Sequence, residues 1–277
     1  SSVNGTGVSS STVMRLVARS TGLKAIPHCA VSRRPTGHTV LPFRPTRPRS
    51  PYPRSVPNLG SLPRPAAKRL AVRLTPDALR RVRAGHPWVY DKSIVSVSHE
   101  GAPGDLAVLF DDDRRFAGIG LWDPTSPIRV KVLHHGKPTT VDRAFWQQRL
   151  TDALARRAPL QARGDTSGYR CVNGENDFLP GLVLDRYDRT LVLKLYTAAW
   201  VPHLADIVPV IEELLHPNAV VLRLARSISA EHLHGLEEGD ALVGVPPDGP
   251  VLFTEHGLLF EADVLAGQKT GHFLDQR

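Results

Sequence analysis

The pattern of hydrophobic and polar positions becomes regular near residue 69. From there to residue 138, short apolar runs alternate with turns rich in Gly and Pro. One helix is predicted to begin at Thr75, a hydroxyl cap that is followed by proline and an acid. The predicted strands cover residues 70–74, 94–97, 106–110, 116–121 and 128–133. Strands of this length and spacing predict a small β-barrel-like module at residues 69–138.

After residue 138 the apolar positions recur at helical spacing. Helices are predicted over residues 141–158, where Pro159 ends the first, and 202–215, where Pro209 kinks or splits the second. Apolar runs of strand length are predicted at residues 169–172, 182–185, 190–196 and 219–224. This mixture predicts an α+β middle domain at residues 139–250.

The last part of the chain, residues 251–277, starts with a predicted hairpin over residues 251–264. Gly267 and Gly271 then enclose Gln-Lys-Thr, which indicates a tight backbone that presents polar side chains and N–H groups to a ligand. Because the chain stops on such a feature, we expect it to be the front part of a larger enzyme.

Positive charge is concentrated at the start of the chain. The first 76 residues hold thirteen of the 35 basic residues and no acidic residue, so the remainder carries a net charge of −5. The overall charge of +8 therefore does not indicate nucleic-acid binding by the folded part. Residues 1–68, rich in Ser, Pro and Arg, predict a disordered basic tail. A start artefact, an organelle transit peptide and a nonspecific phosphate-binding arm stay open as its origin and role.

Cysteine usage and hydropathy indicate the compartment. Cys29 and Cys171 provide neither a disulfide framework nor the spacing of a metal site, which favours a reducing interior. No run of 18 apolar residues exists, so no membrane span is expected. The predicted location is the cytoplasm, or an organelle if the tail is a transit peptide.

No motif supplies a complete active site. Lys269-Thr270 is not a phosphate loop, because Gln268 and Asp263 stand where that motif needs glycine. Cys171 lies inside a predicted strand and is expected to be a buried thiol. No metal site is predicted, since the remaining candidates are better explained as loop, surface or turn residues: Asp111 to Asp113, His232 with His234, and Glu175 with Asp177.

Three separate motifs, in order, resemble the ribosomal RNA large subunit methyltransferase I family. Arg83-Ala-Gly-His-Pro-Trp-Val-Tyr90 and Gly118-Ile-Gly-Leu-Trp-Asp-Pro-Thr-Ser-Pro-Ile-Arg-Val130 resemble its N-terminal PUA domain. Asn173-Gly-Glu-Asn-Asp-Phe-Leu-Pro-Gly-Leu-Val-Leu-Asp-Arg-Tyr187 resembles its middle domain. Glu255-His-Gly-Leu-Leu-Phe-Glu-Ala-Asp263, with Gly267 to Arg277, resembles the opening of its methyltransferase domain.

The resemblance implies an α+β protein: a PUA domain, a middle domain, and the first hairpin of a truncated Rossmann-like methyltransferase domain. It further implies an S-adenosylmethionine-dependent enzyme that methylates C5 of a cytosine in large-subunit ribosomal RNA. Such a reaction needs a cysteine thiolate that adds to C6 and a target base drawn out of its stack. The resemblance places the nucleophilic cysteine and the cofactor loop beyond Arg277. The alternative is a non-catalytic RNA-binding protein with a PUA-like module.

The resemblance also suggests site residues. Those expected near the cofactor or the target base are Gln268, Lys269, Thr270 and Asp275. The basic and polar candidates for RNA contacts are Arg80, Arg81, Arg83, His86, Lys92, Arg129 and Lys131. The aromatic rings of His86, Trp88 and Tyr90 either stack on bases or belong to the core and interface, and the core is favoured for Trp88. Ribosomal RNA is the expected partner, no membrane is expected, and a homodimer stays compatible with the sequence.

Overall fold

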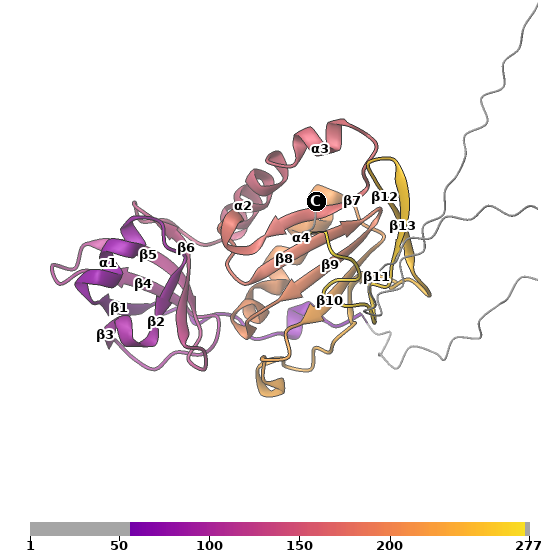
Figure 1. The fold of residues 1–277 in the computed structure, drawn as a ribbon. Helices are drawn as coiled ribbons and strands as arrows, with labels where there is room; N and C mark the ends of the chain where they lie inside the picture. Colours follow the sequence, from indigo (N-terminus) through magenta and orange to yellow (C-terminus); the bar gives the residue numbers. More distant parts are fainter. Residues whose placement is uncertain (1–55, 275–277) are drawn as a thin grey trace, which may run out of the picture.

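The computed structural model describes residues 56–274, which form two joined domains and a C-terminal hairpin (Figure 1). The first domain is a six-stranded sheet in the order β2-β6-β5-β4-β1-β3, in which only β1 and β4 pair in parallel. Its elements are β1 (Leu70–Leu74), α1 (Pro76–Arg83), β2 (Trp88–Tyr90), β3 (Ile94–Val97), β4 (Leu106–Phe110), β5 (Phe116–Trp122) and β6 (Ile128–His135). The predicted strands are all present, and β2 is an additional strand.

Helix α1 forms where the sequence predicts it. The Thr75 hydroxyl accepts a hydrogen bond from the backbone N–H of Ala78 at 3.4 Å, and Pro76 occupies the first helical turn. The helix ends before Gly85, and its buried residues Ala78 and Val82 face the core of the first domain. Capping and one apolar stripe thus fix a helix of only eight residues against the sheet.

The middle domain is a five-stranded sheet in the order β11-β10-β9-β8-β7, with β9 and β10 parallel and the other pairs antiparallel. Its strands are β7 (Gly168–Asn173), β8 (Leu182–Tyr187), β9 (Thr190–Leu195), β10 (Ala219–Leu224) and β11 (Ala241–Gly244). Its helices are α2 (Arg143–Ala155), α3 (Ala158–Ala162) and α4 (Leu204–Leu215). Strand β11 was not predicted, because the segment before it is polar and mixed.

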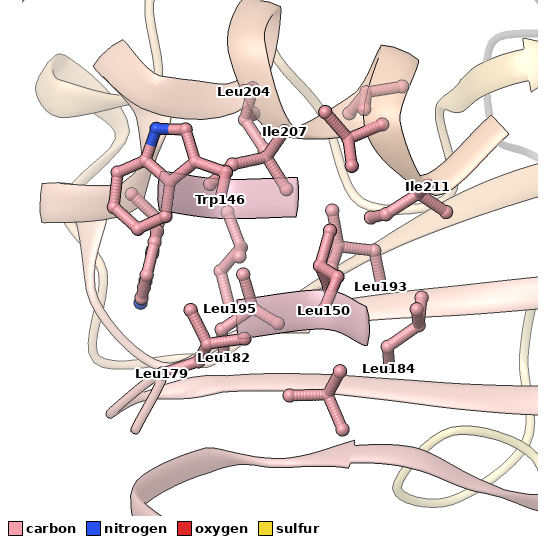
Figure 2. Packing of buried hydrophobic residues seen from close by; sticks show 14 of the residues in the cluster. Trp146, Leu150, Leu179, Leu182, Leu184, Leu193, Leu195, Leu204, Ile207 and Ile211 are labelled. Carbon is pink, nitrogen blue, oxygen red and sulfur yellow. The ribbon is translucent and has the colours of Figure 1, made fainter. Parts of the chain in front are cut away.

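Helices α2 and α4 cover one face of this sheet. Figure 2 shows Leu150 of α2 close to Leu184 and Leu193 of the sheet, and Trp146 of α2 close to Leu204 and Ile207, within one hydrophobic cluster. The apolar alternation of β8 and β9 supplies this core, because every second side chain of a strand points to the same face.

One prediction about proline was wrong, and a second was wrong in part. Pro159 does not end a helix. Helix α2 already ends at Ala155, and Pro159 lies in the first turn of α3, where its missing N–H is not needed. Pro209 does not split α4, which runs through it as one helix, and the predicted kink stays a prediction. The buried face of Ile207, Val208 and Ile211 holds α4 in place although one backbone hydrogen bond is lost. Pro202 lies instead in a 3₁₀ helix, Ala198–His203, that precedes α4.

The second face of the middle sheet is partly covered by the C-terminal hairpin of β12 (Val251–Glu255) and β13 (Leu258–Ala262). The hairpin was predicted from the sequence, and Figure 1 shows it in yellow beside the sheet. Phe253 is fully buried against Tyr187 of β8, with ring centroids 5.2 Å apart, in a small cluster with Val192 and Val221. The hairpin is thus anchored by apolar packing to β8, β9 and β10.

One hydrophobic cluster extends across both domains, in addition to the separate core of the first domain. Ile119 and Leu121 of β5 and Leu133 of β6 belong to the same cluster as Trp146 and Trp200 of the middle domain. Strand β5 is buried almost along its whole length because each of its faces has an apolar partner. The two sheets are therefore joined by apolar packing.

Residues 56–68 correct the predicted extent of the disordered tail. A 3₁₀ turn at Leu59–Ser61 precedes Leu62, whose side chain is buried in the shared core. Arg64 then pairs with Asp206 of α4 at 2.7 Å, and the backbone N–H of Ala66 donates to Asp105 at 2.7 Å. The folded part thus begins before residue 69, and residues 1–55 lie outside the described residues.

His203 gives the domain junction a pH dependence. Its Nε2 lies 2.8 Å from the carbonyl oxygen of Gly104 in the first domain, and burial lowers its pKa below the ordinary 6.5. Between the folded and the unfolded pKa of His203, the unfolded chain therefore binds up to one more proton than the folded chain. By linkage, the free energy of unfolding should fall as the pH decreases through 6.5.

We predict that His203→Gln, which keeps an N–H donor but cannot titrate, makes this pH dependence less steep. The difference should reach up to about 1.4 kcal/mol per pH unit, the free energy of one proton. Urea unfolding at a series of pH values below neutrality measures both slopes. Equal slopes for His203→Gln and the wild-type chain would show that His203 does not titrate on unfolding.

Candidate functional site

The segment after the hairpin has the tight backbone that its two glycines predict. The N–H of Gly267 donates to the carbonyl oxygen of Asp263 at 2.9 Å, and the N–H of Gly271 donates to that of Gln268 at 2.9 Å. A Cβ atom at Gly267 would lie 2.3 Å from the Asp263 oxygen, and Gly271 has a φ of 120°. Both positions therefore need glycine for steric reasons.

Thr270 fastens this segment to the middle sheet. Its side chain is buried, and its hydroxyl donates to Asp185 of β8 at 2.6 Å. The Tyr187 hydroxyl lies 3.0 Å from the Thr270 hydroxyl oxygen. Because Thr270 donates its own proton to Asp185, Tyr187 donates to Thr270, and the Tyr187 oxygen accepts from the N–H of His272 at 3.2 Å. Burial raises the pKa of Tyr187, which keeps this phenol protonated. The Thr270 hydroxyl is thus fully used inside the protein.

Asp185 is the centre of this network. It is completely buried, and the Arg170 guanidinium binds its two oxygens at 2.8 and 3.0 Å. A buried carboxylate is tolerated only where such partners compensate for the lost hydration. The position of the C-terminal segment therefore depends on charges in β7 and β8.

Gln268 and Lys269 lie on the surface and line a cleft of about 770 Å³. The charged residues around this cleft are four cations and one carboxylate, namely Lys194, Arg223, Arg226, Lys269 and Glu238. Arg223 pairs with Glu238 and donates to the carbonyl oxygens of Val264 and Gly267 at 3.0 Å. Lys194 and Arg226 give the cleft a positive potential, although residues 77–277 are acidic on balance.

Adjacent strands bring these cations together. Lys194 of β9 and Arg223 of β10 are direct partners in the parallel register, and like charges in this position repel. Burial lowers the pKa of Lys194, and the Arg223 charge lowers it further. Lys194 donates to the backbone oxygen of Lys269 at 3.3 Å. Sequence reasoning missed Lys194, although it is the only charge in an otherwise apolar strand, which was the available signal.

The basic residues of the first domain that were predicted to contact RNA differ in whether an acidic partner already binds them. Arg80 and Arg81 pair with Asp77 on the exposed face of α1, and Arg83 pairs with buried Asp111 at 2.9 Å. Arg115 and backbone N–H groups also bind Asp111, and the backbone bond to Arg115 contributes most to lowering its pKa to about 2. Asp111 thus organises a loop, as predicted for residues 111–113.

Lys92, His86 and Arg129 differ in exposure. Lys92 is exposed, whereas His86 and Arg129 are half-buried. The His86 Nδ1 atom lies 3.0 Å from the carbonyl oxygen of Trp88. Trp88 itself is half-buried, and its Nε1 donates to Glu175 of the middle domain at 3.0 Å. Trp88 therefore belongs to the domain interface, and Tyr90 is exposed.

Lys131 is a correction to the RNA-contact list. Its side chain is buried, and its Nζ atom lies 2.6 Å from Asp123, which also accepts a hydrogen bond from Thr197 at 2.6 Å. Burial is the largest effect on the Lys131 pKa and lowers it. The ammonium group is thus enclosed between the domains and is not available to a phosphate. A period-two sequence pattern does not reveal which face a second domain covers.

The remaining predictions on chemistry concern Cys171 and metals. Cys171 is fully buried in β7, and burial raises the pKa of its thiol to about 12, so it is no nucleophile at neutral pH. Within residues 56–274 no cluster of His, Cys, Asp and Glu has the arrangement of a metal site. No helix of this part is long and apolar enough to cross a membrane. Asp275, the fourth predicted pocket residue, lies outside the described residues.

Comparisons with known proteins agree with this architecture. A protein-family model described as a PUA-like domain matches residues 72–135. A putative S-adenosylmethionine-dependent methyltransferase from Streptococcus mutans superposes with a TM-score of 0.62 at 17% identity, over 75% of this chain and 52% of that one. A putative methyltransferase in complex with S-adenosylhomocysteine (SAH) gives the same TM-score. The fold is thus a PUA-like domain joined to a mixed α+β domain, as in the N-terminal half of methyltransferase structures.

Sequence relatives are more specific. A ribosomal RNA large subunit methyltransferase of Deinococcus radiodurans is 51% identical over 222 residues, which are 78% of this chain and 54% of that protein. Ribosomal RNA large subunit methyltransferase I of Pseudoalteromonas translucida is 31% identical, over 72% of this chain and 50% of the relative. The chain belongs to the ribosomal RNA large subunit methyltransferase I family, and it spans about half the length of these relatives.

We predict that Thr270→Val, which keeps the side-chain volume but removes the hydroxyl, destabilises the protein by about 1–3 kcal/mol. The buried Tyr187 hydroxyl loses its acceptor and Asp185 loses a donor. Urea unfolding measures the change, and Thr270→Ser should restore most of it. The exposed Thr140 serves as a control, since Thr140→Val should cost less than about 0.5 kcal/mol. Equal effects at the two sites would show that the network does not stabilise the segment.

Proposed function

We propose that this chain is the RNA-holding front part of an S-adenosylmethionine-dependent enzyme that methylates C5 of a cytosine in large-subunit ribosomal RNA. The observation that carries the proposal is the 51% identity to the Deinococcus relative, which extends over both domains and not only over the PUA-like part. The activity, the substrate and the partner of the whole protein are inferred from that relationship.

The described residues fit an RNA strand better than the cofactor. S-adenosylmethionine carries a positive sulfonium, and the charged residues that line the cleft beside Gln268 and Lys269 are mainly cations. Its one carboxylate, Glu238, is paired with Arg223. A sulfonium is best accommodated beside an unpaired carboxylate, whereas phosphates complement the cations of this cleft. When bound elsewhere in the enzyme, the cofactor supplies the methyl group.

The chain's own residues then orient RNA for that chemistry. Arg80, Arg81, Lys92 and Arg129 of the first domain contact phosphates in this proposal, and Gln268 and Lys269 hold the strand that carries the target base. The shared core between the domains keeps these two sets at a fixed separation. The nucleophilic cysteine and a Rossmann-like cofactor domain are proposed to follow Arg277 in the enzyme. The cytoplasm is the proposed place of action, and an organelle is the alternative if residues 1–68 contain a transit peptide.

A second candidate is RNA binding without catalysis. The observation that favours it is that a PUA-like domain and a cationic cleft are both present within residues 56–274, while Cys171 is protonated and buried. Transfer of a labelled methyl group to ribosomal RNA by the complete translation product of the gene separates the two candidates. Methyl transfer contradicts the binding-only function.

We predict that the 277-residue chain binds ribosomal RNA fragments but gives no heat signal with S-adenosylmethionine in titration calorimetry. RNA affinity should fall steeply with salt, because contacts to phosphates release counterions. The full-length Deinococcus relative is the matched control and should bind the cofactor. Micromolar cofactor binding by the 277-residue chain would place a working pocket inside it and contradict the proposed division of labour.

A further inference from the structure

Tyr196 is an exposed aromatic residue on a ridge between two hollows. Its side chain follows β9 directly, and the residue is 52% exposed. It lines both the cationic cleft of about 770 Å³ and a second hollow of about 260 Å³. An exposed tyrosine offers a rigid planar surface at low conformational cost. The position of Tyr196 is therefore suited to a flat ligand group that reaches into both hollows.

Two cations accompany this ring. The Nζ atom of Lys194 lies 5.4 Å from the centroid of the Tyr196 ring, and Arg226 projects from the end of β10 into the same cleft. Because β9 and β10 are parallel, their carboxyl ends, and with them Tyr196 and Arg226, lie at one edge of the sheet. Within residues 56–274 neither Lys194 nor Arg226 has a carboxylate partner within 4.0 Å. Their charges are thus available to an external anion.

The smaller hollow is polar and lies at the domain junction. It is lined by Thr125 and Ser126 of the first domain and by Ser229 and His232 of the middle domain. The Nε2 atom of His232 is buried and makes no hydrogen bond, although a Glu231 oxygen lies 3.4 Å away. The hydroxyls that line this hollow suit a ligand with several donors and acceptors, such as a base edge or a ribose 2′-hydroxyl.

We propose that Tyr196, Lys194 and Arg226 form a subsite for one unpaired nucleotide of an RNA strand. The base stacks on Tyr196, the flanking phosphates contact Lys194 and Arg226, and the base edge or the 2′-hydroxyl enters the smaller hollow. A paired base would be stacked within its helix and could not cover the ring, so the subsite selects unpaired RNA. The proposal rests on the proposed function, because it adds a strand-holding site to an enzyme that acts on RNA.

A photocrosslinking experiment on the 277-residue chain tests the position of the base. The probe is an RNA hairpin with one 5-iodouridine, placed either in the loop or in the stem. Irradiation and peptide mass spectrometry identify the residue that is joined to the probe. We expect a crosslink to Tyr196 from the loop position and none from the stem position. Loop crosslinks that all map to the first domain, to residues such as Tyr90, overturn the subsite.

Fluorescence anisotropy with a labelled single-stranded RNA tests the energetics. Tyr196→Ala should weaken binding about 5- to 150-fold, the value of one lost stacking contact, whereas Tyr196→Phe should stay within about twofold. Lys194→Gln and Arg226→Gln should each reduce the slope of log affinity against log salt by about 0.7. Arg143→Gln is the matched charge control, because Arg143 pairs with Glu213 on the helical side of the sheet. Thermal unfolding confirms that each variant is folded.

The possible outcomes distinguish a failure of the subsite from a failure of the proposed function on which it rests. If the wild-type chain binds no ribosomal RNA at all, the proposed function fails and the subsite fails with it. If the wild-type chain binds but Tyr196→Ala and Lys194→Gln bind equally well, only the subsite is wrong. If polyaspartate binds with the same dependence on Tyr196 as RNA, the cleft belongs to an acidic protein partner and the proposal is overturned.

Discussion

The burial of β5 and β6 against the middle domain is the constraint on which the rest of the structure depends. Ile119, Leu121 and Leu133 complete a core that neither domain closes alone. Once these strands are covered, polar groups at the junction have no access to water and need partners inside the protein. The Asp123–Lys131 pair and the bond of His203 to Gly104 are consequences of that enclosure. Because the junction is packed and hydrogen-bonded, the two domains present their surfaces in a fixed relation.

The second organising feature is the buried carboxylate of Asp185. Arg170 compensates its charge from β7, and Thr270 reaches it from the C-terminal segment. Arg223 contributes in a different way, by holding the backbone oxygens of Val264 and Gly267. The C-terminal segment after β13 is therefore attached at several points to the sheet that precedes it. Movement of this segment would expose Asp185 and release Arg223, which makes a rigid attachment energetically favourable.

The local charge of the cleft differs from the net charge of the folded part. The folded part is slightly acidic, yet Lys194, Arg223 and Arg226 come together because β9 and β10 are parallel and in register. Glu238 neutralises only one of these cations. Uncompensated positive charge in a cleft lowers the stability of the folded protein. Such charge is often found where an anionic ligand binds, because the ligand neutralises it.

The sequence by itself determined the local elements and the order of the modules. Capping fixed α1 at Thr75, alternation fixed the strands, and the two glycines fixed the tight turn at residues 267–271, because these signals act between neighbours in the chain. The family was also readable from three motifs. Only the tertiary structure showed that Lys131 and Thr270 are buried, that α4 continues through Pro209, and that residues 56–68 belong to the folded part. Only the tertiary structure brings Lys194, Tyr196 and Arg226 together in one cleft. The physical reason is that burial and strand register depend on residues far apart in the chain, which no local pattern records.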